Sequence, residues 1–190
     1  MIGMTGDHGM GRFHRFAFDR IAFGRRALGR FGRGQNGRVH ISAKSDYAMR
    51  ALLVLATETE GRPMKAESVA TSQSMPINFV ENILAELKRS GLVLSQRGAS
   101  GGFRLARPAS AITVADVIRA VDGPLAEVRG ESPDAIDYEG PAEHLRTVWV
   151  ATRASLRTVL EHVSLADIVA GKLPAAVTDL TADPEAWSRR

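Results

Sequence analysis

The feature that most constrains the fold lies in residues 65–105, where two short helical patterns are followed by a β-hairpin pattern. Met75 and Pro76 separate the two helices, because proline suits the start of a helix, where its missing N–H would be unpaired anyway. Gly91 supplies a C-terminal cap after the second helix. The order helix, turn, helix, hairpin is typical of a winged helix-turn-helix, whose second helix enters the DNA major groove while the hairpin tip lies along the backbone.

The second helix has one apolar face and one polar face. Apolar residues recur at three- and four-residue spacing and are expected to face the core: Ile77, Val80, Ile83, Leu84 and Leu87. The outer face of its N-terminal half then carries Asn78, Phe79, Glu81 and Asn82. Asparagine can pair with adenine and glutamate can accept from cytosine, so these residues are candidates for base reading. The alternative is that they are ordinary solvated side chains.

The hairpin is predicted from strands at 92–96 and 103–106, joined by a glycine-rich, basic tip. Glycine permits positive backbone angles and a close approach to another molecule. A nucleotide-phosphate loop would place such glycines between a strand and a helix, whereas here a strand follows. The wing residues expected to contact DNA are Arg97, Gly98, Ser100, Gly101, Gly102 and Arg104.

A further helix is predicted from Ser42 to Thr59, with Ser42 or Ser45 as its cap and Gly61 and Pro63 after its end. Three residues near its start are candidates for phosphate contact: Lys44, Ser45 and Tyr47. An ordinary solvated first turn is an equal alternative for all three.

Composition excludes several classes of function. The chain has no cysteine, so disulfides, thiolate metal sites and cysteine nucleophiles cannot form. No apolar run reaches the roughly 18 to 20 residues of a membrane-spanning helix. No nucleophile, base and orienting group can be assembled, so an enzyme is not expected. Net charge is +6 for residues 1–40, +3 for 41–110 and −5 for 111–190, which fits a middle segment that meets phosphates.

The first 38 residues are expected to be a disordered basic extension, since residues 1–37 hold 9 of the 18 glycines. Phenylalanines among arginines leave open a membrane-surface, transit-peptide or nonspecific nucleic-acid role. A further hypothesis is that this extension is not native and that translation begins at Val39, because GTG can encode both valine and a bacterial start.

The residues described so far resemble the Rrf-two (Rrf2) family of bacterial winged helix-turn-helix transcription regulators, the family of IscR, NsrR and CymR. The matching segments are residues 42–52, 76–93, 97–106 and 112–125, and with the C-terminal helix the resemblance covers about 39–173. It implies a homodimer on a partly palindromic operator, contacted by Pro76, Asn78, Phe79, Glu81 and the wing Arg97.

Many members of this family hold an iron–sulfur cluster on three cysteines that follow a Gly-Pro-Leu sequence. The corresponding residues 126–140 contain none, so the usual cluster cannot form, and no cofactor or metal is expected. Asp46 lies where some members draw a non-cysteine ligand, and we interpret it as an acid that favours the helix N-terminus.

A long helix is predicted to begin near Pro141, after a helix over residues 113–121 and a polar loop. Its apolar stripe exceeds what a small DNA-reading domain can cover, and the resemblance assigns it to dimerisation; a plain core helix is the alternative. The expected dimer-interface residues are Leu145, Val148, Trp149, Thr152, Leu156, Val159, Leu160 and Val163. Tyr138, His144 and Trp149, with His162 nearby, are the candidates for an effector pocket, although a lone histidine is more often structural.

The expected fold class is therefore mainly α with a small β-hairpin: a winged helix-turn-helix domain over 39–125 and a loop over 126–140. A dimerisation helix with a short following helix over 141–173 and a tail over 174–190 complete it. The chain is predicted to be a cytoplasmic transcription regulator that binds specific sequences of double-stranded DNA. It is expected to act as a homodimeric repressor. The alternative is a winged-helix module that binds protein. The operator, the regulated genes and any small-molecule effector are unknown from the sequence.

Overall fold

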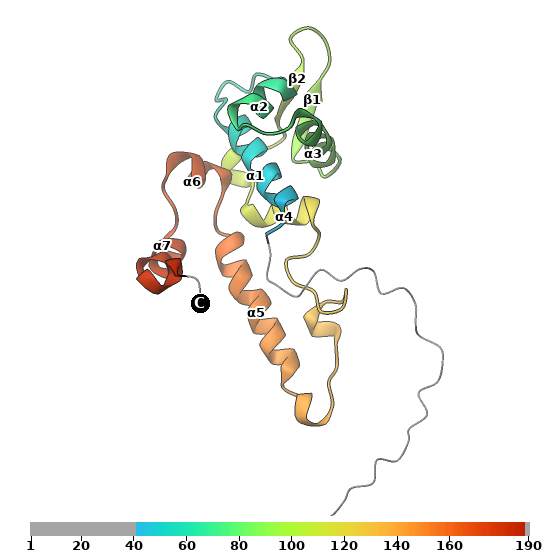
Figure 1. Cartoon of the computed structure of the whole chain (residues 1–190), viewed down its shortest axis with the longest axis vertical. Helices are drawn as coiled ribbons and strands as arrows, with labels where there is room; N and C mark the ends of the chain where they lie inside the picture. Colours follow the sequence, from blue (N-terminus) through green and yellow to red (C-terminus); the bar gives the residue numbers. More distant parts are fainter. Residues whose placement is uncertain (1–40, 189–190) are drawn as a thin grey trace, which may run out of the picture. The chain divides into compact units, whose positions relative to one another are not determined.

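The computed structural model describes residues 41–188, so the predictions made for residues 1–38 lie outside the described residues. Its helices are α1 (Ala43–Ala56), α2 (Ala66–Ser72), α3 (Ile77–Arg89), α4 (Val114–Val121), α5 (Leu145–Leu160), α6 (Leu165–Ala170) and α7 (Ala175–Ala182). Two strands, β1 (Val93–Gln96) and β2 (Gly102–Leu105), form one antiparallel hairpin (Figure 1). The predicted fold class, mainly helical with a small β-hairpin, is confirmed.

Helix α1 begins at the predicted cap. The Ser42 hydroxyl accepts a hydrogen bond from the Ser45 backbone N–H at 2.9 Å, and Asp46 lies in the first turn, where an acid favours the helix dipole. The opposite face of the helix is buried through Ala48, Ala51, Leu52 and Leu55. Helix α1 thus forms the centre of the core, in contact with α2, α3, α4, α6 and β2.

The turn between α2 and α3 is held by Met75, whose backbone N–H donates to Ala70 and whose side chain is buried. Pro76 is the N-cap of α3. Val80, Ile83, Leu84 and Leu87 are buried as predicted, whereas Ile77 is 37% exposed. Successive helical residues are about 100° apart, which puts Ile77 at the edge of the apolar stripe, so its prediction as a core residue was wrong.

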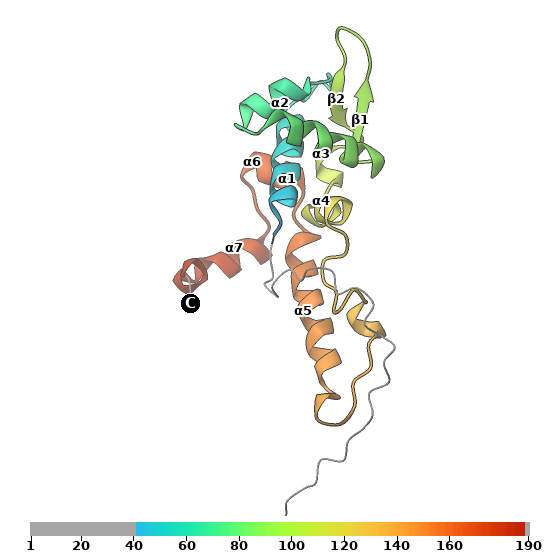
Figure 2. The same cartoon turned by 45° about the vertical axis from the view of Figure 1, so that its right-hand side comes forward.

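The hairpin is tied to the helical core through one residue ahead of α2. Met64 pairs with Phe103 of β2 by two backbone hydrogen bonds of 2.8 Å, one in each direction. Val93 and Leu92 are buried beneath α3, while the rest of β1 is exposed. The wing is therefore anchored at its base and open toward its tip, next to α3 (Figure 2).

Helix α6 belongs to the core of the DNA-reading domain. Leu165 is fully buried, and its N–H donates to the carbonyl of Ile112 just ahead of α4. Val163, predicted at the dimer interface, is only 5% exposed, and its carbonyl accepts from Val114. That prediction was wrong, because the chain folds back after α5 and pairs Ser164 with Thr113. The predicted domain boundary at residue 125 omits this returning segment.

Helix α5 is the most exposed long helix of the described residues, since none of its residues is buried. It starts at Leu145, after a 3-10 turn at Gly140–Ala142, rather than at Pro141. It packs on the turn at Pro133–Ala135, where Pro133 and Ile136 are buried. The tail predicted over 174–190 carries helix α7 and a 3-10 turn at Pro184–Trp187. Within residues 41–188, no helix has the length and apolar character needed to span a membrane.

Candidate nucleic-acid interface

The N-terminal half of α3 presents a row of exposed polar side chains. Asn78, Glu81 and Asn82 are all exposed, as predicted. Within residues 41–188, none of these three side chains forms a hydrogen bond or an ion pair. A base-reading side chain needs such unused donors and acceptors, because a group already paired within the protein would have to give up that bond. The exposed Pro76 lies at the same end of the helix.

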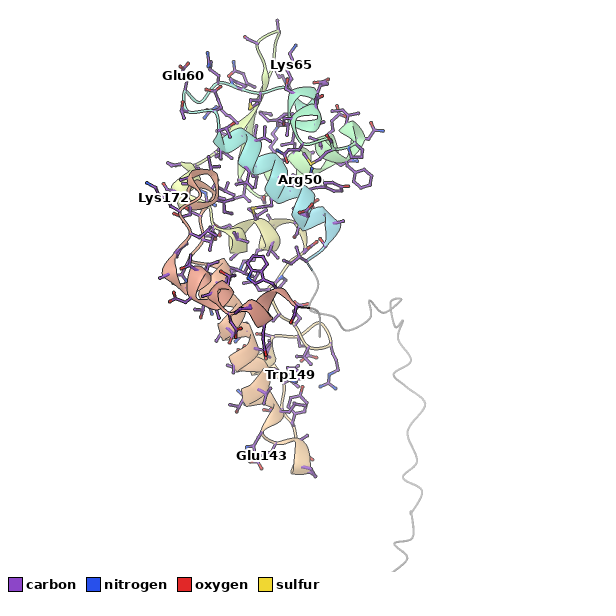
Figure 3. The ribbon with its side chains drawn as sticks, turned by 60° about the vertical axis from the view of Figure 1, so that its left-hand side comes forward. Arg50, Glu60, Lys65, Glu143, Trp149 and Lys172 are labelled. Atoms are coloured by element: carbon purple, nitrogen blue, oxygen red, sulfur yellow. The ribbon has the colours of Figure 1, made fainter. Side chains whose placement is uncertain are left out.

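An aromatic and cationic cluster adjoins this row. Phe79 is 58% exposed, and its ring lies 6.0 Å from the ring of Tyr47 on α1, centroid to centroid. The Arg50 guanidinium lies 5.6 Å from the Tyr47 ring and donates to the carbonyl of Gln73 in the α2–α3 turn. Arg50 was missed by the sequence analysis, because its i,i+4 spacing from Asp46 looks like a simple surface ion pair. Arg50, which is labelled in Figure 3, links α1 to the turn of the helix-turn-helix.

The wing tip is a tight turn in which the Gly101 N–H donates to the carbonyl of Gly98 at 2.9 Å. Arg97, Ser100 and Arg104 are exposed, and the two arginines have no ion pair within the described residues. Gly101 is buried, and a Cβ there would lie 2.4 Å from the carbonyl oxygen of Gln96. Its contribution to the wing is therefore close packing of the backbone.

A shallow groove beside the wing tip adds cations that the sequence analysis missed. Its volume is about 320 Å³, and its lining includes Arg62, Lys65, Gln96, Ser100 and Gly101. Lys65 is exposed and has no ion pair within residues 41–188, whereas Arg62 pairs with two glutamates (Figure 3 labels Lys65). The hairpin brings Lys65 next to Ser100, which sequence distance alone could not indicate.

The first turn of α1 departs from the prediction. Ser45 is only 2% exposed, and its hydroxyl donates to the Asp122 carboxylate at 2.7 Å. The Lys44 ammonium donates to Glu86 of α3 at 2.7 Å and also to the carbonyl of Val121. These partners make both residues structural links between α1, α3 and the end of α4. Ser45 is thus corrected from a DNA contact to a buried link, and Lys44 is already engaged.

Tyr138, His144 and Trp149, the residues predicted to form an effector pocket, do not line the cavity that the described residues form beside α5. Tyr138 lies under the Arg129 guanidinium, 6.0 Å from ring centroid to cation, and His144 is an exposed residue at the start of α5. The Trp149 indole N–H is buried with no partner among the described residues. Beside α5 there is instead a cavity of about 410 Å³, lined by the end of α4, residues 124–127 and two arginines of α5.

The exposed polar side chains of α3 lie beside a basic wing, and α1 and α2 support both elements. This arrangement defines a winged helix-turn-helix DNA-binding protein. The chain is a member of the Rrf2 family, since residues 41–171 match the family model described as "Iron-dependent Transcriptional regulator". The family assignment made from the sequence is confirmed, and so is the expectation of a DNA-binding regulator of transcription rather than an enzyme.

Known proteins of this kind cover most of the chain. The chain is 45% identical over 145 residues to Rv1287 of Mycobacterium tuberculosis, which is named as an HTH-type transcriptional regulator. The aligned region spans 76% of this chain and 90% of Rv1287. The solved structure of CymR, the global cysteine regulator of Bacillus subtilis, has a TM-score of 0.59 at 30% identity and covers 70% of this chain and 97% of CymR. The structure of T. potens IscR has a TM-score of 0.55 at 28% identity and covers 80% of this chain and 93% of the IscR chain.

The iron named in the family description does not fit the residues present. The chain contains no cysteine, so no thiolate can hold an iron–sulfur cluster. Within residues 41–188, no group of three or more histidine, aspartate or glutamate side chains is arranged to hold a metal ion. No step of the function is therefore assigned to iron.

Proposed function

We propose that this chain is a homodimeric repressor that acts in the cytoplasm on a partly palindromic operator, without an iron–sulfur cluster. The observation that carries the proposal is the row of exposed, unpaired side chains on the N-terminal half of α3 beside a basic wing. A repressor needs only to occupy DNA that a polymerase must reach, so DNA reading is sufficient for the activity.

Base reading is assigned to Asn78 and Glu81. Amide and carboxylate groups match the edges of adenine and of the cytosine amino group in the major groove. Phe79, exposed between them and in contact with Tyr47, offers an apolar surface to a thymine methyl group. Arg97, Arg104 and Lys65 contribute charge that attracts the phosphate backbone whatever the base sequence.

Dimerisation is assigned to the face of α5 that points away from its own chain. Val148 is 52% exposed, and Thr152 and Val159 follow it on the same side of the helix at spacings of four and seven residues. The face toward the turn at Pro133–Ala135 carries Trp149, whose indole N–H is already buried within one chain. A two-fold pair of α5 helices would give two α3 helices related by the symmetry that a palindrome requires.

The DNA-binding part of the proposal is tested on operator fragments identified by genome-wide footprinting. Asn78→Ala should cost roughly 1–3 kcal/mol of specific binding and relax the preference at one base pair. Arg97→Ala should weaken binding to all sequences and lower the salt dependence. Arg146→Ala on α5, an exposed arginine paired with Asp137, is the matched control and should change neither. Wild-type affinity in both interface variants would contradict the assignment.

Dimerisation and repression need separate measurements. Sedimentation equilibrium should give a dimer for the wild type and a monomer for Val148→Asp, because a buried unpaired carboxylate is strongly unfavourable. Thr147→Asp, at an exposed position about 100° around the helix from Val148, is the control and should remain dimeric. In transcription reconstituted on an operator-containing promoter, added protein should lower transcript yield; an increase would show an activator instead.

A further inference from the structure

The cavity beside α5 has an unusual concentration of guanidinium groups. Arg119 comes from α4, while Arg153 and Arg157 lie one turn apart on α5, and all three line the same space of about 410 Å³. Leu125 and Pro124 supply apolar lining, and Ser132 supplies a hydroxyl. A volume of this size falls in the range of small-molecule sites, which combine apolar walls with a few placed polar groups.

The arginines hold two carboxylates of the protein itself. Ser132 donates to the Asp134 carboxylate, and Arg153 pairs with it at 2.6 Å; these hydrogen bonds, first that of Ser132 and then that of Arg153, lower the pKa of Asp134 to about 2. Arg119 and Arg157 both bind one oxygen of Glu161. The hydrogen bond from Arg119, and to a smaller extent the one from Arg157, holds the pKa of Glu161 below its usual range. The arginines of the cavity lining therefore already bind carboxylates at two positions, one to Asp134 in the lining and one to Glu161 just outside it.

The charges at these two positions are not balanced in the same way. Asp134 and Arg153 form a one-to-one pair, whereas the single carboxylate of Glu161 serves two guanidinium groups. Each guanidinium offers five N–H donors, so the second position retains both positive charge and unused donors. Glu127, the other acid of the lining, has no ion pair within residues 41–188, and its one negative charge equals the one positive charge left at the second position.

We propose that this cavity binds a small dicarboxylate that regulates DNA binding, an inference that rests on the proposed function for its effect on the operator. One ligand carboxylate binds Arg119 and Arg157 beside Glu161. The other binds Arg153 and Ser132 in place of Asp134, whose side chain is 56% exposed and can turn into solvent. The short apolar span of the ligand lies against Leu125 and Pro124.

A connection to the DNA-reading helix begins two residues before Pro124. The carbonyl of Val121 and the carboxylate of Asp122 receive hydrogen bonds from Lys44 and Ser45 at the start of α1. Lys44 also binds Glu86 on α3. Because Arg119 lies on α4 itself, a ligand that pulls on Arg119 acts on the same helix end that positions α1 and α3.

Binding is tested first without DNA, so that its failure is distinguishable from failure of the proposed function. Malonate, succinate and glutarate are titrated into the ¹⁵N-labelled full chain at constant ionic strength, with succinamide as the uncharged control. At least one dicarboxylate should shift the amide signals of Arg119, Ser132 and Arg153 saturably, and succinamide should not. Absence of a saturable shift with all three dicarboxylates would overturn the proposal.

Variants then locate the site. Arg153→Gln and Arg157→Gln should each weaken dicarboxylate binding at least tenfold, while Arg146→Gln, which removes a guanidinium from the same helix outside the cavity lining, should bind as the wild type does. Unchanged binding in both cavity variants would place the site elsewhere. The same dicarboxylate should change operator affinity in the wild type and leave it unchanged in Arg153→Gln; an equal change in both would refute the coupling.

Discussion

Replacing Gly102 by alanine should unfasten the wing from the helical core. A Cβ at this position would lie 2.4 Å from the Met64 carbonyl oxygen and 2.6 Å from its carbon, distances that force the backbone to move. The same Met64 carbonyl accepts the Phe103 N–H, and the Met64 N–H donates back to Phe103. The displaced strand would therefore lose the pair of hydrogen bonds that closes the base of the wing.

Gly98 provides a matched control for the size of this effect. Both glycines have positive φ, +104° at Gly98 and +158° at Gly102, but a Cβ at Gly98 meets no atom within 4 Å. Gly98→Ala should show only the conformational cost of a non-glycine residue at positive φ, about 1–3 kcal/mol. Gly102→Ala should additionally lose two backbone hydrogen bonds at about 0.5–1.5 kcal/mol each, a further ~1–3 kcal/mol.

Urea unfolding of the two variants measures the difference, provided that the m-value remains unchanged. Operator titrations should show that Gly102→Ala binds more weakly than Gly98→Ala, because Arg97 and Arg104 on the wing lose their fixed position. Equal unfolding free energies for the two variants, within about 0.5 kcal/mol, would refute the reasoning that the Met64 contact anchors the wing.

Three further predictions concern other parts of the molecule. Leu165→Ala should lower the free energy of unfolding by about 2–5 kcal/mol in urea titration, because Leu165 is fully buried against the DNA-reading core; a change below 0.5 kcal/mol would refute the placement of α6. Phe79→Ala should weaken operator binding while leaving the unfolding midpoint nearly unchanged, since its ring is 58% exposed. NMR titration should give Asp134 a pKa of about 2, rising toward 3.8 in Arg153→Gln, so its contribution to stability is present above about pH 4 and is lost as pH falls to about 2.

The helix-turn-helix and wing could be predicted from the sequence because their signals are local. The apolar spacing of α3 fixes its buried face, and the glycines of the wing mark its tip wherever the rest of the chain lies. Ser42 and Thr113 cap their helices through residues only three positions away. These interactions form between near neighbours, so one stretch of sequence contains both partners.

Apart from Ile77 at the edge of the apolar stripe of α3, the wrongly predicted residues are those whose partner is distant. Ser45 looks like a solvated first-turn serine until α4 brings Asp122, 77 positions along the chain, onto its hydroxyl. Val163 has no spacing that distinguishes a residue of the dimer stripe from a core residue; only the return of the chain after α5 buries it. Arg50 likewise shows its function only when the α2–α3 turn presents the carbonyl of Gln73.

Apart from the contact of Arg50 with Gln73, the distant contacts that escaped prediction involve α4 or the residue that follows it. Lys44 joins α3 to the end of α4, and Ser45 joins α1 to the residue that follows α4. At the other end of α4, Thr113 pairs with Ser164, and Arg119 within it pairs with Glu161 at the end of α5. Helix α4 is thus held at both ends, by the DNA-reading helices on one side and by the segment around α5 and α6 on the other. Among the described residues, α4 therefore lies between the C-terminal segment and α3, in contact with both α3 and α5.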